Sequence, residues 1–145
     1  MAQNIHIGCD HAALDLKNII IRQLEERGLT VTDHGTYTPE SCDYPDIAHD
    51  VAQAVEKETG TGILLCGTGI GMSMAANKVP GIRCALCTDS LQAEMTRRHN
   101  DANMMALGAG VTGPNLAKRM LVLFLNTEFE GGRHARRVAL LDAIH

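Results

Sequence analysis

The sequence has few aromatic residues and no strong excess of either charge. Among its 145 residues there is no Trp, with only two Tyr and two Phe, and 13 Lys and Arg stand against 17 Asp and Glu, a formal net charge of −4. Proteins that bind nucleic acid usually present a basic surface, and those that bind single strands add aromatic side chains for base stacking. The composition therefore argues against a nucleic-acid-binding protein.

Long apolar segments and an export signal are also missing. No uninterrupted apolar run reaches the roughly 20 residues that span a bilayer, and residues 1–6 contain neither a cationic segment nor an apolar block. We expect no membrane association and a cytoplasmic location. The length predicts a single domain, residues 1–145, that buries roughly 68% of its unfolded surface without needing disulfide bonds.

The cysteines do not form a disulfide or zinc pattern. There are five of them, an odd number, which does not suit a disulfide framework: Cys9, Cys42, Cys66, Cys84 and Cys87. The C-x-x-C pair at 84 and 87 has no second pair of ligands with similar spacing, as a zinc site would need. It lies in a predicted strand, where residues three apart point to opposite faces, so we expect buried structural thiols.

What the sequence does contain is a regular alternation of two kinds of segment. Short apolar runs predict strands at 5–8, 29–33, 61–66, 82–87 and 104–108, and helical spacing predicts helices at about 12–27, 45–57, 72–78, 90–99, 114–125 and 133–144. This order predicts an α/β, three-layer Rossmann-like sandwich, with a mainly parallel sheet of about five strands and helices on both faces. In such sheets ligands bind beyond the carboxyl ends of the strands.

A glycine loop follows the third predicted strand. Gly67, Gly69 and Gly71 alternate with other residues before a helix, so several N–H groups can approach a phosphate or an oxyanion. The loop lacks the Lys of a P-loop, and Met72 replaces the last glycine of a dinucleotide fingerprint. A tight turn with no ligand remains the alternative. Cys66 precedes the loop, as either a reactive thiolate near a helix N-terminus or a buried strand residue.

Other polar residues have two readings each. Asp10 and His11 follow the first strand, where Asp10 could also cap a helix, and His99 closes a helix, where it could interact with the dipole alone. Arg133 and Arg137 share a helix face that could bind phosphate or simply contact water. Because no H-x-x-x-H or H-E-x-x-H motif is present, we expect no metal site.

Taken together, these motifs resemble the ribose-5-phosphate isomerase B family, which includes the galactose-6-phosphate isomerase subunits. The matching residues span nearly the whole chain in the family's order: Gly8-Cys9-Asp10-His11, Asp43-Tyr44-Pro45, Cys66-Gly67-Thr68-Gly69-Ile70-Gly71-Met72-Ser73, Ala75-Ala76-Asn77-Lys78, Gly81-Ile82-Arg83, His99-Asn100-Asp101, Gly131-Gly132-Arg133-His134 and Arg137. The resemblance implies interconversion of ribose 5-phosphate and ribulose 5-phosphate through an enediolate, with neither metal nor cofactor. It also implies a homodimer or homotetramer whose sites are shared between subunits.

The resemblance also implies a role for each site residue. Cys66 is the base, and the oxyanion is held by the backbone of the loop (Gly67, Gly69, Ile70 and Gly71) with help from Thr68. His99 assists ring opening. The sugar hydroxyls contact Asp10, Tyr44 and Asn100, and the phosphate contacts His11, Arg133 and Arg137.

One departure from the family pattern concerns phosphate binding. Members usually carry an arginine in a Gly-x-Arg-Val context after the fifth strand, where this chain has Gly110. The absent arginine leaves open a different sugar phosphate, allose 6-phosphate or galactose 6-phosphate. It also leaves open a sugar-phosphate-binding module without catalysis.

Overall fold

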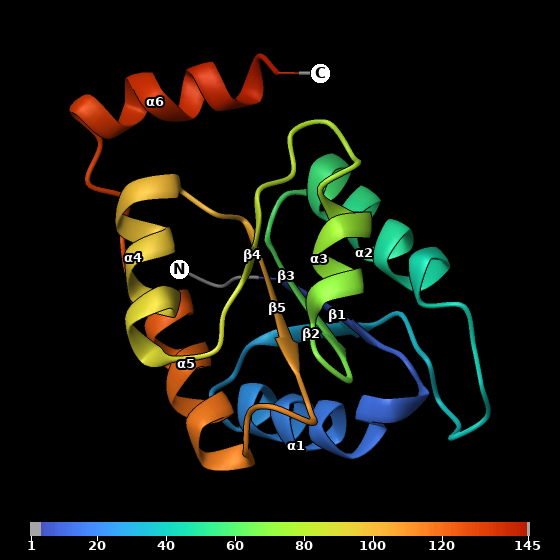
Figure 1. The fold of residues 1–145 in the computed structure, drawn as a ribbon. Helices are drawn as coiled ribbons and strands as arrows, with labels where there is room; N and C mark the ends of the chain where they lie inside the picture. The colour runs from blue at the N-terminus through green and yellow to red at the C-terminus, as the bar shows by residue number, and fades with distance from the viewer. Residues whose placement is uncertain (1–3, 145) are drawn as a thin grey trace.

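The centre of the molecule is a parallel sheet whose three middle strands are buried. In the computed structural model, which describes residues 4–144, the strands are β1 (Asn4–Cys9), β2 (Thr30–Asp33), β3 (Thr61–Cys66), β4 (Cys84–Leu86) and β5 (Met104–Gly108). They lie in the order β2-β1-β3-β5-β4, and all neighbours are parallel (Figure 1). The apolar run 63–65 in β3 suits a strand that is covered on both faces.

Helices cover both faces of the sheet. α1 (Leu14–Glu26), α4 (Ser90–Asn100) and α5 (Pro114–Asn126) pack on one face, and α2 (Tyr44–Glu58) and α3 (Ile70–Ala76) pack on the other. The first face buries residues such as Ile20 and Phe124, and the second buries Val51 and Met72. Each fully buried side chain of this size contributes roughly 1.5–3 kcal/mol. The predicted three-layer α/β sandwich is confirmed, and its five-stranded sheet is wholly parallel.

The winding of the chain reverses between β1 and β3. From β1 the chain crosses to β2 at one edge, and then returns past β1 to form β3 on its other side. Neighbouring strands whose connections run in opposite directions open a crevice beyond their carboxyl ends. β1 ends at Cys9, whose register partner in β3 is Leu65, so Asp10 and Cys66 follow side by side at this crevice.

Several observed boundaries differ from the predicted ones. Residues 11–13 form a 3-10 turn, η1 (His11–Ala13), so α1 begins at Leu14 rather than at residue 12. The strand predicted at 82–87 is shorter, because the N–H of Arg83 donates to the Asn103 side chain instead of to a neighbouring strand. Asp89 caps α4, because its side chain accepts the N–H of Gln92.

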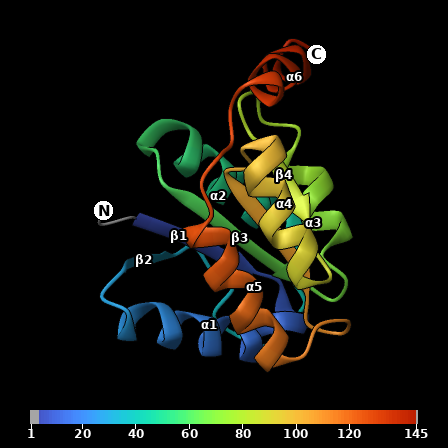
Figure 2. The ribbon, with the colours of Figure 1, turned by 90° about the vertical axis from the view of Figure 1, so that its left-hand side faces the viewer.

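The last helix, α6 (Arg133–Asp142), stands apart from the sandwich. It packs chiefly against α4, and Figure 2 shows it projecting beyond the other helices. His134 is its one buried residue in the part of the chain that the structure describes, while Leu140 and Leu141, and Ile144 just beyond the helix, are exposed. An apolar helix surface of this kind favours a partner. No helix within residues 4–144 is long and apolar enough to cross a membrane.

Candidate active site

Cys66 lies where β3 turns into the glycine loop, residues 67–71. Its side chain is buried, with 6% exposure, and its Sγ accepts a hydrogen bond from the N–H of Gly69 at 3.0 Å. Gly69 has a φ of 83°, a left-handed conformation that glycine adopts without strain. The N–H of Gly69 thus holds the sulfur at the start of the loop. The thiol is therefore built into the loop rather than packed only as an apolar strand residue.

The glycine loop is supported from behind by the end of β5. A Cβ atom on Gly108 would lie 2.5 Å from main-chain atoms of Thr68, so only glycine lets the two backbones approach this closely. The N–H of Gly110 donates to the carbonyl oxygen of Gly67 at 2.9 Å, and the N–H of Ala109 donates to that of Cys66 at 2.8 Å. These contacts hold the loop in one conformation before any ligand binds.

The exposed surface of the loop is polar on one side and lies against an aromatic ring on the other. The Thr68 side chain is exposed, and its Oγ1 accepts the N–H of Ile70 at 3.3 Å. Tyr44, the first residue of α2, lies directly over Gly71: a Cβ there would be 2.6–2.9 Å from ring and hydroxyl atoms of the tyrosine. The tyrosine hydroxyl is thereby fixed beside the loop.

Asp10 and His11 bring the end of β1 to the same edge. The N–H of Asp10 donates to the carbonyl oxygen of Leu65 at 3.0 Å, next to Cys66. The Asp10 carboxylate accepts the N–H of Ala12 at 2.9 Å, which confirms it as the cap of η1. His11 Nδ1 accepts the N–H of Cys42 at 3.3 Å. The strand ends and the loop before α2 therefore bring Asp10, His11, Tyr44 and Cys66 to one edge.

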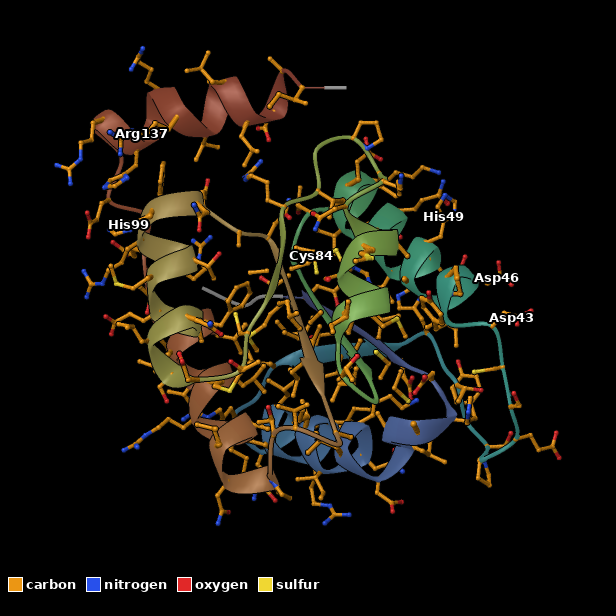
Figure 3. The ribbon with its side chains drawn as sticks, in the orientation of Figure 1. Asp43, Asp46, His49, Cys84, His99 and Arg137 are labelled. Carbon is orange, nitrogen blue, oxygen red and sulfur yellow. The ribbon has the colours of Figure 1, made fainter. Side chains whose placement is uncertain are left out.

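The remaining predicted residues lie at the opposite edge of the sheet. α4 starts at the carboxyl edge and runs back for 11 residues, about 16 Å at 1.5 Å per residue. His99 and Asn100 therefore lie at the amino edge. α6, which begins at Arg133, lies at the same edge and places Arg137 near His99 (Figure 3). His99, Asn100 and Arg137 line one cleft of about 380 Å³. One chain thus gathers the predicted residues into two separate groups.

Arg83 connects the second group. Its Nε donates to the carbonyl oxygen of Asn100 at 3.0 Å, and its Nη1 contacts both carboxylate oxygens of Asp142 at 3.2 and 2.9 Å. The end of α4 and the end of α6 are therefore joined through one guanidinium group. The Gly-Ile-Arg motif was visible in the sequence, but it carried no indication of this role.

Two further residues lie in this group: Glu130, which sequence reasoning did not select, and His134, which belongs to a matching motif but was given no role. A Glu130 carboxylate oxygen lies 3.9 Å from His99 Nε2 and 3.5 Å from His134 Nε2. Burial lowers the pKa of His134, as do the nearby His99 and Arg133, and Glu130 only partly opposes them. His134 is thus neutral near pH 7. The two histidines are far apart in sequence, so no spacing motif could reveal the cluster.

The C-x-x-C pair is structural, as predicted. Cys84 belongs to the core under α2 and α3, whereas Cys87 belongs to the core on the other face of the sheet. Burial raises the pKa of each thiol to about 12. These two sulfurs therefore remain protonated near neutral pH.

Comparison with known proteins identifies the family. The Ribose/Galactose Isomerase family model matches residues 5–141. The chain is 46% identical to ribose-5-phosphate isomerase B of Escherichia coli, covering 98% of this chain and 96% of the other. It is 51% identical to a D-erythrulose-4-phosphate isomerase of Pectobacterium atrosepticum, covering 93% and 90%. A ribose 5-phosphate isomerase structure from Thermotoga maritima superposes with a TM-score of 0.96 at 46% identity, covering 99% and 100%.

These similarities place the protein among the isomerases that act on sugars within the α/β class of folds. More particularly, the chain belongs to the ribose/galactose isomerase family. The resemblance drawn from its motifs is thereby confirmed.

Proposed function

We propose that the protein interconverts ribose 5-phosphate and ribulose 5-phosphate with Cys66 as the base and without a metal ion. The observation that carries the proposal is the hydrogen bond from the N–H of Gly69 to Cys66 Sγ at 3.0 Å, within a loop that is already held in place. A base next to a carbonyl substrate needs both a desolvated position and preorganised donors, and this arrangement supplies both.

The reaction follows from these two elements. The Cys66 thiolate removes the proton from C2 of the open-chain aldose, and the electron pair moves into the C1–C2 bond as the carbonyl oxygen becomes an oxyanion. N–H groups of residues 67–71 and the Thr68 hydroxyl stabilise that charge. The thiol then returns the proton to C1, and the proton of the C2 hydroxyl passes to the oxyanion on C1, so that C2 becomes the ketose carbonyl. No outside oxidant or reductant is required.

Asp10, His11 and Tyr44 would hold the substrate at this edge. The Asp10 carboxylate and the Tyr44 hydroxyl lie beside Cys66 and the loop, where they can bind sugar hydroxyl groups. His11 lies next to Cys42 and is exposed, which suits a contact with the phosphate.

The second group of residues requires another copy of the chain. In one chain, this group lies about one helix length from Cys66. It consists of His99 for ring opening, Asn100 for a hydroxyl group, and Arg133 and Arg137 for the phosphate. We therefore propose a homodimer, or a homotetramer built from such dimers, in which the α4–α6 edge of one domain completes the Cys66 edge of another. The exposed apolar side of α6 supports this arrangement.

The cytoplasm is the location that suits the thiols. All five cysteines are free, and an oxidising compartment would oxidise thiols that are only half-buried, such as Cys42.

A second substrate deserves the same assay. The identity to the D-erythrulose-4-phosphate isomerase, 51%, exceeds that to the E. coli ribose-5-phosphate isomerase B, 46%. D-Erythrulose 4-phosphate has one carbon fewer than ribulose 5-phosphate. Gly110 adds no side chain where family members usually carry the phosphate-binding arginine. Allose 6-phosphate and galactose 6-phosphate test the opposite possibility of a longer sugar.

Initial rates with these four sugar phosphates in the presence of EDTA test the proposal. We expect the highest kcat/KM with ribose 5-phosphate, no loss with EDTA, and no measurable turnover for Cys66→Ala. Cys87→Ala is the matched control, because this thiol is also buried at a strand end but lies on the other side of the sheet. Turnover by Cys66→Ala would refute the role of Cys66 as the base. Binding without turnover in the unmodified protein would indicate a non-catalytic module.

Mixing two inactive variants tests the shared site. Cys66→Ala and His99→Asn each damage a different half, so a mixed dimer regains one intact site. After random exchange of subunits, about a quarter of the sites should be active. A mixture that stays inactive, although light scattering shows dimers that exchange, would contradict the shared arrangement.

A further inference from the structure

The cluster of His99, Glu130 and His134 has the composition of a metal site. The three side chains come from α4, from the loop before α6 and from α6 itself, and their nearest ligand atoms all lie within 4.8 Å of one another. The histidine rings stack with centroids 4.2 Å apart and planes 12° apart, and the Nε2 atoms lie 3.9 Å (His99) and 3.5 Å (His134) from the same Glu130 oxygen. Two imidazoles and one carboxylate are a common ligand set for Zn²⁺.

His134 provides an independent indication that something binds here. Its side chain is buried, with the residue 6% exposed, yet its Nε2 has no hydrogen-bond partner within residues 4–144. A buried polar atom without a partner costs about 1–3 kcal/mol. With its proton on Nδ1, an imidazole offers a lone pair at Nε2. A metal ion would satisfy that lone pair.

The distances are close to those that coordination requires. Ligand atoms about 2.0–2.1 Å from a tetrahedral Zn²⁺ lie roughly 3.3 Å from one another. The Glu130 oxygen is already 3.5 and 3.9 Å from the two nitrogens, so each side chain needs to move by well under 1 Å in these directions. The nearly parallel rings must also tilt toward each other for both Nε2 lone pairs to reach one ion.

We propose that this cluster binds a divalent transition metal of the Zn²⁺ class and that the bound metal inhibits the enzyme. Binding depends only on the three ligands. Inhibition rests on the proposed role of His99 in ring opening, because a coordinated His99 Nε2 can no longer accept or donate a proton. Water or an anion would complete the coordination.

The charges around the cluster limit how tightly it binds. Arg98 Nη1 lies 3.7 Å from the other Glu130 oxygen, and the charges of Arg133 and Arg137 act on His134. These cations repel a metal ion, and salt screens exposed charges. Affinity for the metal should therefore rise with ionic strength, whereas it would fall at a site formed mainly by acidic groups.

Competition with a chromophoric zinc chelator tests binding without any assay of activity. The parent for this test carries Cys42→Ala and Cys66→Ala, so that neither of these thiols can bind zinc. We expect one ion per chain, and a loss of affinity greater than about 100-fold in Glu130→Gln and in His134→Asn, since even residues behind the ligands contribute about 10–100-fold. Glu128→Gln, an exposed glutamate two residues earlier, is the matched control and should bind like the parent.

A second readout identifies the ligands. Co²⁺ in the parent should give visible ligand-field bands without thiolate charge-transfer absorption, and Glu130→Gln should remove the bands. Equal affinity of Glu130→Gln, His134→Asn and the parent would overturn the site, as would a parent that binds no metal. In the unmodified chain, Zn²⁺ should reduce turnover reversibly, and Glu130→Gln should be less sensitive than Glu128→Gln. If Zn²⁺ inhibits Glu130→Gln and Glu128→Gln equally, the proposed inhibition is overturned. If the unmodified chain shows no turnover at all, that result counts against the isomerase proposal alone.

Discussion

Substitution of Gly108 by alanine tests whether the position of the glycine loop controls catalysis. The added Cβ would lie 2.5 Å from the Cα and carbonyl carbon of Thr68. Carbon atoms prefer separations of about 3.5 Å or more, so the two backbones must separate by roughly 1 Å. Neither can yield as a flexible side chain would, because Gly108 ends a central strand and Thr68 lies in a turn joined to it by hydrogen bonds.

The expected effects are a moderate loss of stability and a large loss of rate. Overpacking of this kind costs about 1–3 kcal/mol. A displacement of about 1 Å at a reacting centre can cost about 100-fold. Since the loop N–H groups act on charge that develops only in the transition state, the loss should appear in kcat rather than in KM. Initial rates with ribose 5-phosphate and urea denaturation measure the two effects.

Gly113→Ala is the control for this experiment. No atom lies within 4 Å of a Cβ at Gly113, and its φ of −72° suits alanine, although the residue caps α5. The control should lose up to about 1 kcal/mol of stability through the weaker cap while kcat remains unchanged. If Gly108→Ala keeps the kcat of the unmodified protein, the loop position does not control catalysis and the argument from backbone contact is refuted.

Three further predictions concern groups away from the candidate site. Lys17 is buried and its Nζ lies 2.8 Å from an Asp33 oxygen. Lys17→Met should therefore lower the free energy of unfolding, measured by urea denaturation, by about 3 kcal/mol. A loss below about 1 kcal/mol would contradict the importance of this ion pair. Burial and the nearby His34 lower the pKa of His6 from 6.5. The folded state therefore binds a proton on His6 less readily than the unfolded chain does. Stability should be constant above about pH 6.5 and fall below it, with a smaller fall in melting temperature for His6→Gln. Cys84 and Cys87, with pKa values of about 12, should resist iodoacetamide at pH 8 until urea unfolds the chain, as peptide mass mapping would report.

The fold could be predicted because its signals are local. Short apolar runs alternating with helical spacing recur along the whole chain, and the parallel sheet follows from the connections between them. Boundaries were less predictable where tertiary contacts decide them. Arg83 has a strand-like neighbourhood in sequence, but its N–H donates to the side chain of Asn103, so β4 starts at Cys84, two residues later than predicted.

The glycine loop shows what a local pattern leaves out. Alternating glycines correctly indicated close backbone approach, but the partner of that approach, Gly108 at the end of β5, is about 40 residues away in the sequence. The same holds for His99, Glu130 and His134. Their meeting depends on how α6 folds back onto α4, which no spacing rule for a single helix describes.

The separation of the two groups of site residues follows from the direction of the helices. In a parallel sheet every connecting helix runs opposite to the strands, so a residue after a strand, such as Cys66, lies at one edge, and a residue that closes a helix, such as His99, lies at the other. No movement of side chains can bring them together in one chain. If both act on one substrate, a second copy must supply one of them. The active unit would then be the pair of chains, and the exposed α6 of one chain would lie over the partner's strand ends.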